Sequence, residues 1–441
     1  MQKGIFIRPE EVQDSLRKFM LVDGFDMTLD LHESKNGYLY DSKGKRNLLD
    51  FFTFVASNPL GMNHPKLNNP EFIEKIGKIA LNKPSLSDIY AYEQATFVDT
   101  FFRVAVPSYF KYSFFIEGGA LAVENTLKAA IDWKVRKNFA KGYKEEKGLQ
   151  IIHFKEAFHG RSGYTLSLTN TDPNKIIYFP KFNWPRVTNP KITFPLNEEN
   201  LKNVIAAEEQ SIKEIKDAIT NNKDDIAAII VEPIQGEGGD NQFRKEFFMQ
   251  LRQICNENEM LLIFDEVQTG IALTGKMWAH QYFVKPDLIS FGKKTQVCGV
   301  LSTDRIDEIE ENVFVKPGRI NSTWGGNIVD MVRFQRILEI IEEDNLVKNC
   351  ELMGQHLMAG MNKLSEKYPD KVYSCRGLGL FAAFDTKDAD MRNKIMNDSV
   401  KNGMLILGCG AKSIRFRPPV TVTKEHIDEG MKILDKVISQ L

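Results

Sequence analysis

The sequence has no long hydrophobic run and almost no excess of charge, and each absence excludes a class of protein. Its longest apolar runs, IAAIIV (226–231) and MLLIF (260–264), are far shorter than the roughly 20 residues of a membrane-spanning helix. Lysine plus arginine number 58 and aspartate plus glutamate 59, for a formal net charge of -1. We therefore expect neither a transmembrane protein nor a protein with the basic excess that binds nucleic acid.

Cysteine is scarce and shows no metal-binding or disulfide pattern. The five cysteines form an odd set without CxxC or similar spacings, at positions 255, 298, 350, 375 and 409. We expect reduced thiols and no bound metal.

The N-terminal stretch MQKGIFIRPEEVQDSLRKFM lacks the apolar core of a signal peptide and mixes acidic with basic residues, so a cytoplasmic protein is expected.

The middle of the chain alternates short apolar runs with longer amphipathic ones, which predicts an α/β fold with a mainly parallel sheet. Strands that are buried on both faces are apolar throughout, and four segments meet this description: 149–154, 226–233, 260–266 and 287–291. A helix is predicted over 119–133, because its apolar residues at 123, 127, 130 and 131 recur at helical spacing.

At 441 residues the chain exceeds the usual size of a single hydrophobic core, so we expect two domains. After residue 327 the strand pattern gives way to a long helical stretch. We predict a large domain over 76–327 that contains the parallel sheet, and a smaller α+β domain over 328–441. The N-terminal segment, 1–75, is predicted to pack with the smaller domain.

Polar residues follow each predicted strand at its carboxyl end. They are Phe158 to Arg161, Glu232 to Glu237, Asp265, and Lys293. In open α/β sheets, ligands bind in the crevice outside the carboxyl ends of the strands. One polar residue at such a place is usually a solvated loop residue, but four groups at one sheet edge predict a binding site.

Two glycine-containing segments imitate nucleotide-binding motifs. GIALTGKM (270–277) matches G-x-x-x-x-G-K, but Met277 replaces the hydroxyl residue that binds magnesium, and the loop follows an acidic strand that it should precede. GLGLFA (377–382) runs into a strand-like segment where the dinucleotide fingerprint requires a helix. We interpret both as structural turns.

A lysine after one buried strand, an aspartate at the end of another and a glycine-initiated helix are the parts that pyridoxal phosphate needs. Lys293 or Lys294 would form a Schiff base with the cofactor aldehyde, and Asp265 would keep the pyridine nitrogen protonated. The helix N-terminus at 118–120 would offer backbone N–H groups to the phosphate. Phe158 could cover the ring, although a lone phenylalanine more often packs in a core.

Several segments resemble the class III aminotransferases, a pyridoxal-phosphate-dependent family of fold type I, the aspartate-aminotransferase fold. They are IFDEVQTGIALTGKMWAHQYFVKPDLISFGKK (263–294), VEPIQGEGGD (231–240) and IRFRPP (414–419), and the similarity extends over most of the chain. Within the class, segments 117–130, 158–172 and 291–300 are more similar to lysine 6-aminotransferases than to enzymes for ornithine or 4-aminobutyrate. The resemblance implies transfer of the ε-amino group of L-lysine to 2-oxoglutarate.

The resemblance also assigns cofactor roles. Lys293, directly after the strand-end glycine, matches the family's Schiff-base lysine, and Lys294 is expected to point elsewhere. Asp265 matches the partner of the pyridinium nitrogen, and Thr323 matches a residue that reaches the phosphate from the other subunit, which implies a homodimer. The remaining cofactor-binding matches are Gly119, Ala120, Phe158, His159 and Gln268. Because the family's usual phosphate loop with its hydroxyl side chain is replaced by Gly-Gly-Ala-Leu (118–121), phosphate binding is left to backbone amides.

Three residues are implied in substrate binding, because a transaminase must hold an amino donor and a keto acceptor in one cavity. Guanidinium groups bind carboxylates well. The resemblance implies that Arg161 holds the α-carboxylate of lysine and Arg415 a carboxylate of 2-oxoglutarate, with Glu237 pairing with Arg415 during the lysine half-reaction. Arg417, two residues on, leaves the assignment to Arg415 dependent on the alignment.

Other activities compete with this interpretation. An aminotransferase for ornithine or 4-aminobutyrate would use the same cofactor residues. An aminomutase of the same fold would shift an amine within one substrate and need no keto acid. A non-catalytic relative is disfavoured, because Lys293, Asp265 and Gln268 are all present.

Overall fold

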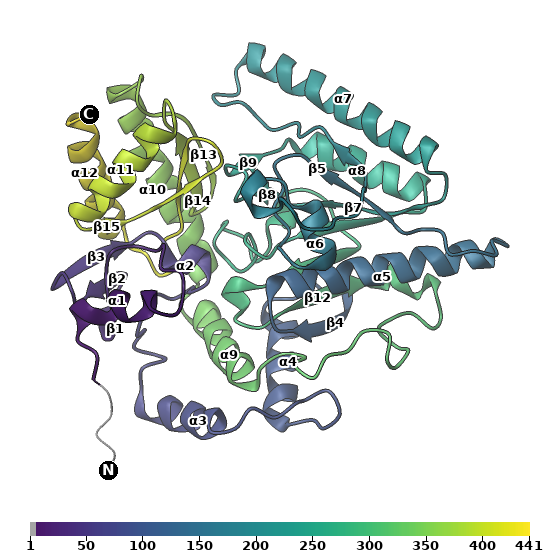
Figure 1. The fold of residues 1–441 in the computed structure, drawn as a ribbon, viewed down its shortest axis with the longest axis horizontal. Helices are drawn as coiled ribbons and strands as arrows, with labels where there is room; N and C mark the ends of the chain where they lie inside the picture. Colours follow the sequence, from purple (N-terminus) through teal and green to yellow (C-terminus); the bar gives the residue numbers. More distant parts are fainter. Residues whose placement is uncertain (1–5) are drawn as a thin grey trace.

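The structure is a computed structural model in which residues 6–441 are described. Figure 1 shows a larger α/β part with the long helices α5 (Gly119–Ala140) and α7 (Glu198–Asn221), and a smaller part with α1 (Val12–Arg17) and α12 (Lys424–Ser439). Residues 1–5 lie outside the described residues. Two predictions fall partly on them: the N-terminal segment 1–75 and the absence of a signal peptide. None of the described helices is both long enough and apolar enough to cross a membrane.

A seven-stranded sheet forms the centre of the larger part, in the order β4-β12-β11-β10-β7-β5-β6. Only β12 runs against its neighbours, pairing antiparallel with both β11 and β4. The mainly parallel sheet predicted from the sequence is thus confirmed. The strands are β4 (Phe110–Ile116), β5 (Gln150–Phe154), β6 (Arg186–Val187), β7 (Ile226–Val231), β10 (Leu261–Asp265), β11 (Leu288–Phe291) and β12 (Cys298–Thr303).

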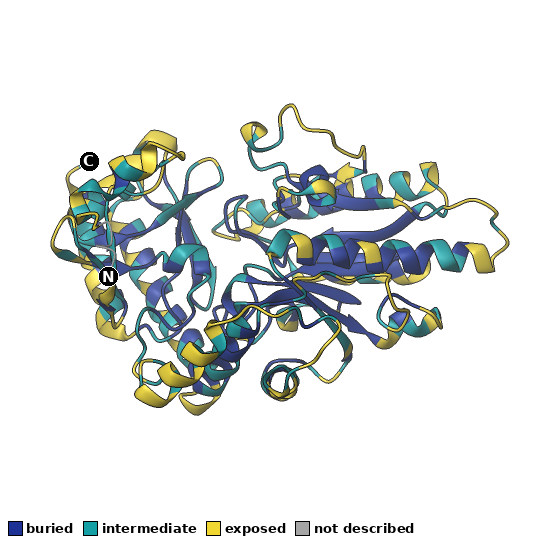
Figure 2. Cartoon of the chain, turned by 60° about the horizontal axis from the view of Figure 1, so that its bottom comes forward, coloured by how far each residue is buried: buried dark blue, intermediate teal, exposed yellow. Residues whose placement is uncertain are grey.

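The four predicted strands are β5, β7, β10 and β11, each buried on both faces. Along β10, Leu262 and Phe264 join one apolar cluster, and Leu261 and Ile263 join the other. Helix α5 covers the second face, while α8 (Lys245–Glu257) packs on the first. Figure 2 shows the buried strands running between helices whose outer surfaces are exposed. The carboxyl ends of the parallel strands therefore meet at one edge of a rigid core.

The smaller part contains an antiparallel sheet in the order β13-β14-β17-β16. The helical stretch predicted after residue 327 forms α9 (Ile328–Glu343), which packs on α4 (Tyr92–Val104) of the larger part, and α10 (Leu346–Lys367), which packs on β13. The domain boundaries proposed after residues 75 and 327 stay a prediction. The other elements are β13 (Tyr373–Leu378), β14 (Phe381–Asp385), α11 (Ala389–Lys401), β16 (Leu407–Cys409) and β17 (Ser413–Phe416).

The beginning of the chain is joined to its end through backbone hydrogen bonds. Strand β15 (Met404–Leu405) pairs in parallel with β3 (Arg46–Asp50), which continues a sheet with β1 (Leu29–Lys35) and β2 (Tyr38–Asp41). Just beyond β3, the N–H of Phe51 donates to Leu405 O at 3.0 Å, and its carbonyl accepts from Arg417 N at 2.9 Å. The start of the chain thereby supports the strand that carries Arg415.

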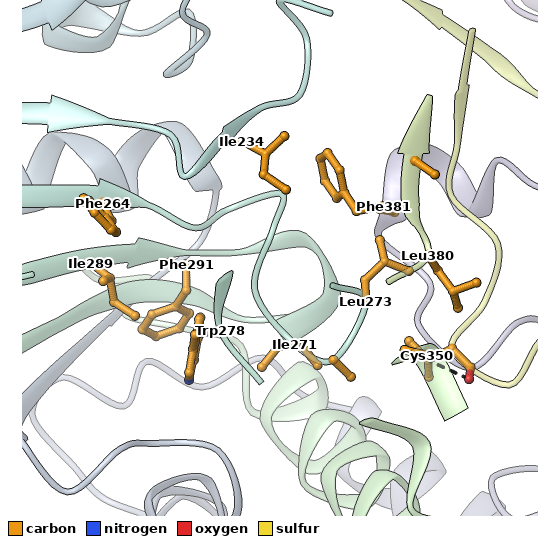
Figure 3. Close-up of a cluster of buried hydrophobic side chains, with 14 of the residues drawn as sticks. Ile234, Phe264, Ile271, Leu273, Trp278, Ile289, Phe291, Cys350, Leu380 and Phe381 are labelled. Carbon is orange, nitrogen blue, oxygen red and sulfur yellow. Dashed lines mark hydrogen bonds between the residues drawn. The ribbon is translucent and has the colours of Figure 1, made fainter. Parts of the chain in front are cut away.

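Both segments that imitate nucleotide-binding motifs are structural, as predicted. Residues 377–382 form the tight turn of the β13–β14 hairpin. Segment 270–277 leads only into a short 3-10 helix, Ala279–Tyr282, where a phosphate-binding loop would lead into an α-helix. Figure 3 shows Leu273 beside Leu380 in a buried apolar cluster, and Leu380 N donates to Leu273 O at 2.8 Å. Gly379 has φ +56, and a Cβ there would lie 2.4 Å from the carbonyl carbon of Thr274. Glycine is therefore required where the two segments meet.

Candidate active site

A cavity of about 360 Å³ lies at the carboxyl ends of β5, β7, β10 and β11, within the roughly 300–1,000 Å³ range of small-molecule sites. We call it the Lys293 cavity. All of its lining residues except Val267 belong to the groups or single residues predicted from the sequence, although Gly160 and Glu232 were given no role of their own. The lining consists of Gly119, Ala120, Phe158, His159, Gly160, Arg161, Glu232, Asp265, Val267, Gln268 and Lys293.

Lys293 and its neighbour Lys294 point to different surroundings. Lys293 borders the cavity, and burial together with the nearby charges of Arg415 and Arg417 lowers the pKa of its amine to about 8. Lys294 is buried away from the cavity, and its Nζ donates to the backbone oxygen of Gln268 at 2.5 Å. A lysine attacks a carbonyl carbon only as the neutral amine. Burial lowers the pKa of Lys294 as well, so it is the position at the cavity that singles out Lys293 as the nucleophile.

Asp265 ends strand β10 and is held as a hydrogen-bond acceptor. Its Oδ2 lies 2.8 Å from Nδ1 of His159, and its Oδ1 accepts from Val267 N at 3.1 Å and from the Ser290 hydroxyl at 3.2 Å. A carboxylate accepts through both oxygens, and with this bond His159 carries its proton on Nδ1. The carboxylate is therefore fixed in orientation, ready to face a cationic ring nitrogen.

Glu232 lies in the cavity wall, and the sequence placed it in the polar group at the end of the predicted strand 226–233 without giving it a role. It follows β7 directly, and its two carboxyl oxygens accept from Phe158 N at 3.0 Å and Gly236 N at 3.1 Å. Burial raises its pKa to about 7. The sequence does contain a signal for it, because an apolar strand that ends in Glu-Pro places a carboxylate at the sheet edge where the ligand is expected.

The N-terminus of α5 forms one end of the cavity. Gly118, at φ +101, turns the chain into the helix, and Gly119 and Ala120 line the cavity. The loop after β5 packs closely against this end of α5. A Cβ on Gly160 in that loop would lie 2.6 Å from the Cβ of Ala120, so there is no room for a side chain at position 160. The first N–H groups of a helix carry partial positive charge and bind phosphate well.

Arg415, on β17, and Arg417, just after it, are bound differently, which favours Arg415 as the residue with donors available for a ligand. Arg417 is fully buried and saturated: it pairs with Asp240 through two nitrogens, at 2.5 and 2.8 Å, and donates to Gln268 Oε1 at 2.9 Å. Arg415 donates from Nη2 to Glu237 at 2.9 Å, while its Nε and Nη1 are buried without a partner among residues 6–441. Arg415 has donors left for a ligand, and Arg417 orients Gln268.

Glu237 has a second cationic partner that the sequence did not indicate. Lys175 Nζ donates to Glu237 Oε1 at 2.6 Å, opposite the Arg415 bond to Oε2. Burial by itself would raise the pKa of Glu237, but the charges of Arg415 and Lys175 outweigh it and lower the pKa to about 2. Lys175 lies 62 residues from Glu237 in the chain, and no local motif predicts the contact.

Two predicted residues lie towards the solvent. Arg161 is exposed at the cavity rim, with its guanidinium carbon 5.9 Å from the centre of the Phe158 ring. Thr323 is exposed in the loop before α9 and does not line the Lys293 cavity of its own chain. The loop nevertheless lies beside the start of α5, because Glu117 N donates to Trp324 O at 3.2 Å.

The chain is similar to known aminotransferases over nearly its whole length. The sequence model described as aminotransferase class-III matches residues 21–438. An L-lysine-epsilon aminotransferase of Mycobacterium tuberculosis is 48% identical over 422 residues, covering 95% of this chain and 93% of the relative. A 4-aminobutyrate aminotransferase of Emericella nidulans is 32% identical over 449 residues, covering 97% of this chain and 88% of the relative.

A solved structure agrees with this result. The lysine aminotransferase from M. tuberculosis in the internal aldimine form has a TM-score of 0.96 at 46% identity, covering 98% of this chain and all of that one. The sequence match, the fold and the lysine and aspartate at adjacent strand ends agree with one another. The chain belongs to the class III aminotransferases and is a transaminase of fold type I.

Proposed function

We propose that the protein is an L-lysine 6-aminotransferase, which moves the ε-amino group of L-lysine to 2-oxoglutarate and gives 2-aminoadipate 6-semialdehyde and L-glutamate. The observation that carries the proposal is the Glu237–Arg415 pair at 2.9 Å. L-Lysine presents an amine that is far from its carboxylate, so it needs no free cation near the reacting centre. 2-Oxoglutarate has a second carboxylate, which does need one. The lysine-specific relatives, at 48% identity against 32% for the 4-aminobutyrate enzyme, support the same donor.

Pyridoxal phosphate is the proposed cofactor, and the cavity fits it. The N–H groups at Gly119 and Ala120 would bind the phosphate, Asp265 the ring nitrogen, Gln268 the ring hydroxyl and Phe158 the ring face, with His159 holding Asp265 in place. When bound, the cofactor supplies an electron sink for the carbon that loses its proton. Lys293 would carry the cofactor aldehyde and afterwards accept and return that proton as a neutral amine.

Substrate binding is proposed to use two guanidinium groups at different times. Arg161 at the rim would bind the α-carboxylate of lysine, whose chain then leads the ε-amine inward to Lys293. While Glu237 neutralises Arg415, that arginine attracts no second carboxylate. A guanidinium binds a carboxylate as a fork through Nη2 together with Nε or Nη1, and Glu237 holds Nη2 while the pair is intact. Once the pair separates, Nη2 and one of the two unpartnered nitrogens are free to bind a carboxylate of 2-oxoglutarate in this way.

An amine-donor comparison tests the function. With 2-oxoglutarate as acceptor, we expect L-lysine to be turned over at least about tenfold faster than L-ornithine or 4-aminobutyrate, a difference of about 1.4 kcal/mol. Glutamate and the cyclised semialdehyde are measured together. Faster turnover of ornithine or 4-aminobutyrate would identify another ω-aminotransferase, and amine migration without any keto acid would identify an aminomutase.

A homodimer is proposed in which Thr323 serves the neighbouring site. Thr323→Ala should then weaken cofactor retention by roughly 10- to 150-fold, the effect of one lost hydrogen bond of about 1.5–3 kcal/mol to a charged group. Mixed dimers of Lys293→Ala and Thr323→Ala chains would regain one complete site, because the intact Lys293 of one chain meets the intact Thr323 of the other. If the mixed dimers bind cofactor no better than Thr323→Ala alone, Thr323 acts within its own chain.

A further inference from the structure

We propose that Lys175 is a positioning residue for Glu237, holding its carboxylate when that carboxylate leaves Arg415. Lys175 would thereby set how readily the pocket accepts a diacid. The inference rests on the proposed function, because the exchange of partners belongs to the two half-reactions of a transaminase with unlike substrates.

The carboxylate of Glu237 bridges two cations with one oxygen each. Lys175 Nζ lies 2.6 Å from Oε1, and Arg415 Nη2 lies 2.9 Å from Oε2. The Lys175 side chain is 16% exposed, that of Arg415 5% and that of Glu237 29%, so both contacts are partly shielded from water. Charge-assisted bonds of this length are the strong kind, and Lys175 is in place before Glu237 moves.

A second cavity provides room on the Lys175 side of the pair. It measures about 440 Å³ and is bordered by Lys175 and Glu237 but not by Arg415. Two more charged groups border it: Asp172, and Arg392, whose Nη1 donates to the carbonyls of Gly410 and Ala411. Lys175 is already bonded to Glu237, whereas Arg392 makes no hydrogen bond to it among the described residues, so Lys175 is the cation towards which the released carboxylate can turn.

The energetic consequence falls on one half-reaction. With Lys175 present, the released Glu237 keeps a charged partner, and the low pKa of its carboxyl, about 2, reflects both cations acting against burial. Without Lys175, the paired state still has Arg415, but the released state has a partly buried carboxylate with no cation, which is costly. Loss of Lys175 therefore disfavours release and slows the reaction with 2-oxoglutarate, while the lysine half-reaction proceeds from the paired state.

The test measures each half-reaction in single turnovers of the holoenzyme. Lys175→Met, which keeps the apolar stem, should lower the rate constant for 2-oxoglutarate, measured on enzyme loaded with pyridoxamine phosphate, on the order of tenfold. The lysine rate should change less than about twofold, and Lys175→Arg should restore most of the loss. The matched control is Lys191→Met, which removes a lysine–glutamate contact of the same 2.6 Å, to Glu156, and should change neither rate.

A second variant separates this role from a purely structural one. In the Glu237→Ala background, Lys175→Met should have no further effect on the 2-oxoglutarate rate, because the carboxylate it holds is gone. An equal loss in both half-reactions, an unchanged 2-oxoglutarate rate, or a full effect without Glu237 would each overturn the proposal. The pyridoxamine-phosphate measurement does not use lysine. A wild-type enzyme that rejects lysine would therefore refute the proposed function, while the 2-oxoglutarate rates of Lys175→Met with and without Glu237 would still decide this proposal.

Discussion

Replacing Lys293 by alanine is expected to abolish transamination, with a loss on the order of 10⁴-fold or more, because the variant lacks both the covalent anchor and the proton-transfer group. Cofactor should still bind through the phosphate and ring contacts. In the wild-type holoenzyme, borohydride reduction should attach the cofactor to a peptide that contains Lys293. Peptide mapping by mass spectrometry and single-turnover absorbance changes with L-lysine measure the two effects.

Lys294 supplies the matched control. It is fully buried and holds the Gln268 carbonyl at 2.5 Å, so Lys294→Met, which fills the same space, is a fairer comparison than alanine. That variant should keep most of the turnover and lose some thermal stability, since the Gln268 carbonyl loses its donor. Cofactor recovered on Lys294, or substantial turnover by Lys293→Ala, would contradict the assignment.

Replacing Glu237 by alanine should change which donor the enzyme prefers. Arg415 would be left permanently unpaired, so diacids gain a binding partner and L-glutamate competes with L-lysine in the first half-reaction. The lysine-to-glutamate ratio of single-turnover rates should fall by about 5- to 150-fold, corresponding to about 1–3 kcal/mol for a lost charge-assisted contact. Glu156→Ala removes another lysine-paired glutamate, one that is bonded to Lys191 and not to Arg415, and should leave the ratio unchanged. An unchanged ratio in Glu237→Ala would make Glu237 merely structural.

In the wild-type enzyme, the ratio of lysine to glutamate rates should not depend on pH between about pH 5 and pH 9. Although burial opposes it, the pairing with Arg415 and Lys175 keeps the pKa of Glu237 at about 2. A carboxyl with a lowered pKa is fully ionised above its ordinary value and loses its charge only as the pH falls through the lowered one. Between about pH 5 and pH 9 the pair therefore stays charged, and a ratio of lysine to glutamate rates that changes over that interval would point to another group.

The central strands could be predicted from the sequence because their burial leaves a direct trace. Strands β5, β7, β10 and β11 are covered on both faces, so nearly every position is apolar. Strands β4 and β12 were missed. In β4, FKYSFFI alternates polar with aromatic residues, and β12 begins with Cys-Gly directly after the Lys293 turn, so neither gives a continuous apolar run. What makes them strands is pairing with each other, a tertiary effect.

The site was predictable where a residue's position follows from the end of a strand. Asp265 and Lys293 lie at adjacent strand ends, and the parallel pairing of β10 with β11 brings them to one edge. Glu237 and Arg415 were assigned by resemblance alone, since 178 residues separate them. Lys175 gave no signal, because a lysine in a short loop is usually solvated and only the folded chain brings it to Glu237. The role proposed for Thr323 involves a second chain, which one sequence cannot describe.

The pairing of β3 with β15 has a consequence for biosynthesis. More than 350 residues separate Leu49 from its partner Met404, so β3 leaves the ribosome long before the strand that completes it. Until then, β3 presents an open edge with unsatisfied backbone groups, the kind that recruits strands from other chains. Contacts this distant in sequence close slowly, and larger chains expose such edges during folding. Nascent chains stalled before residue 404 should therefore depend on chaperones more than full-length chains do.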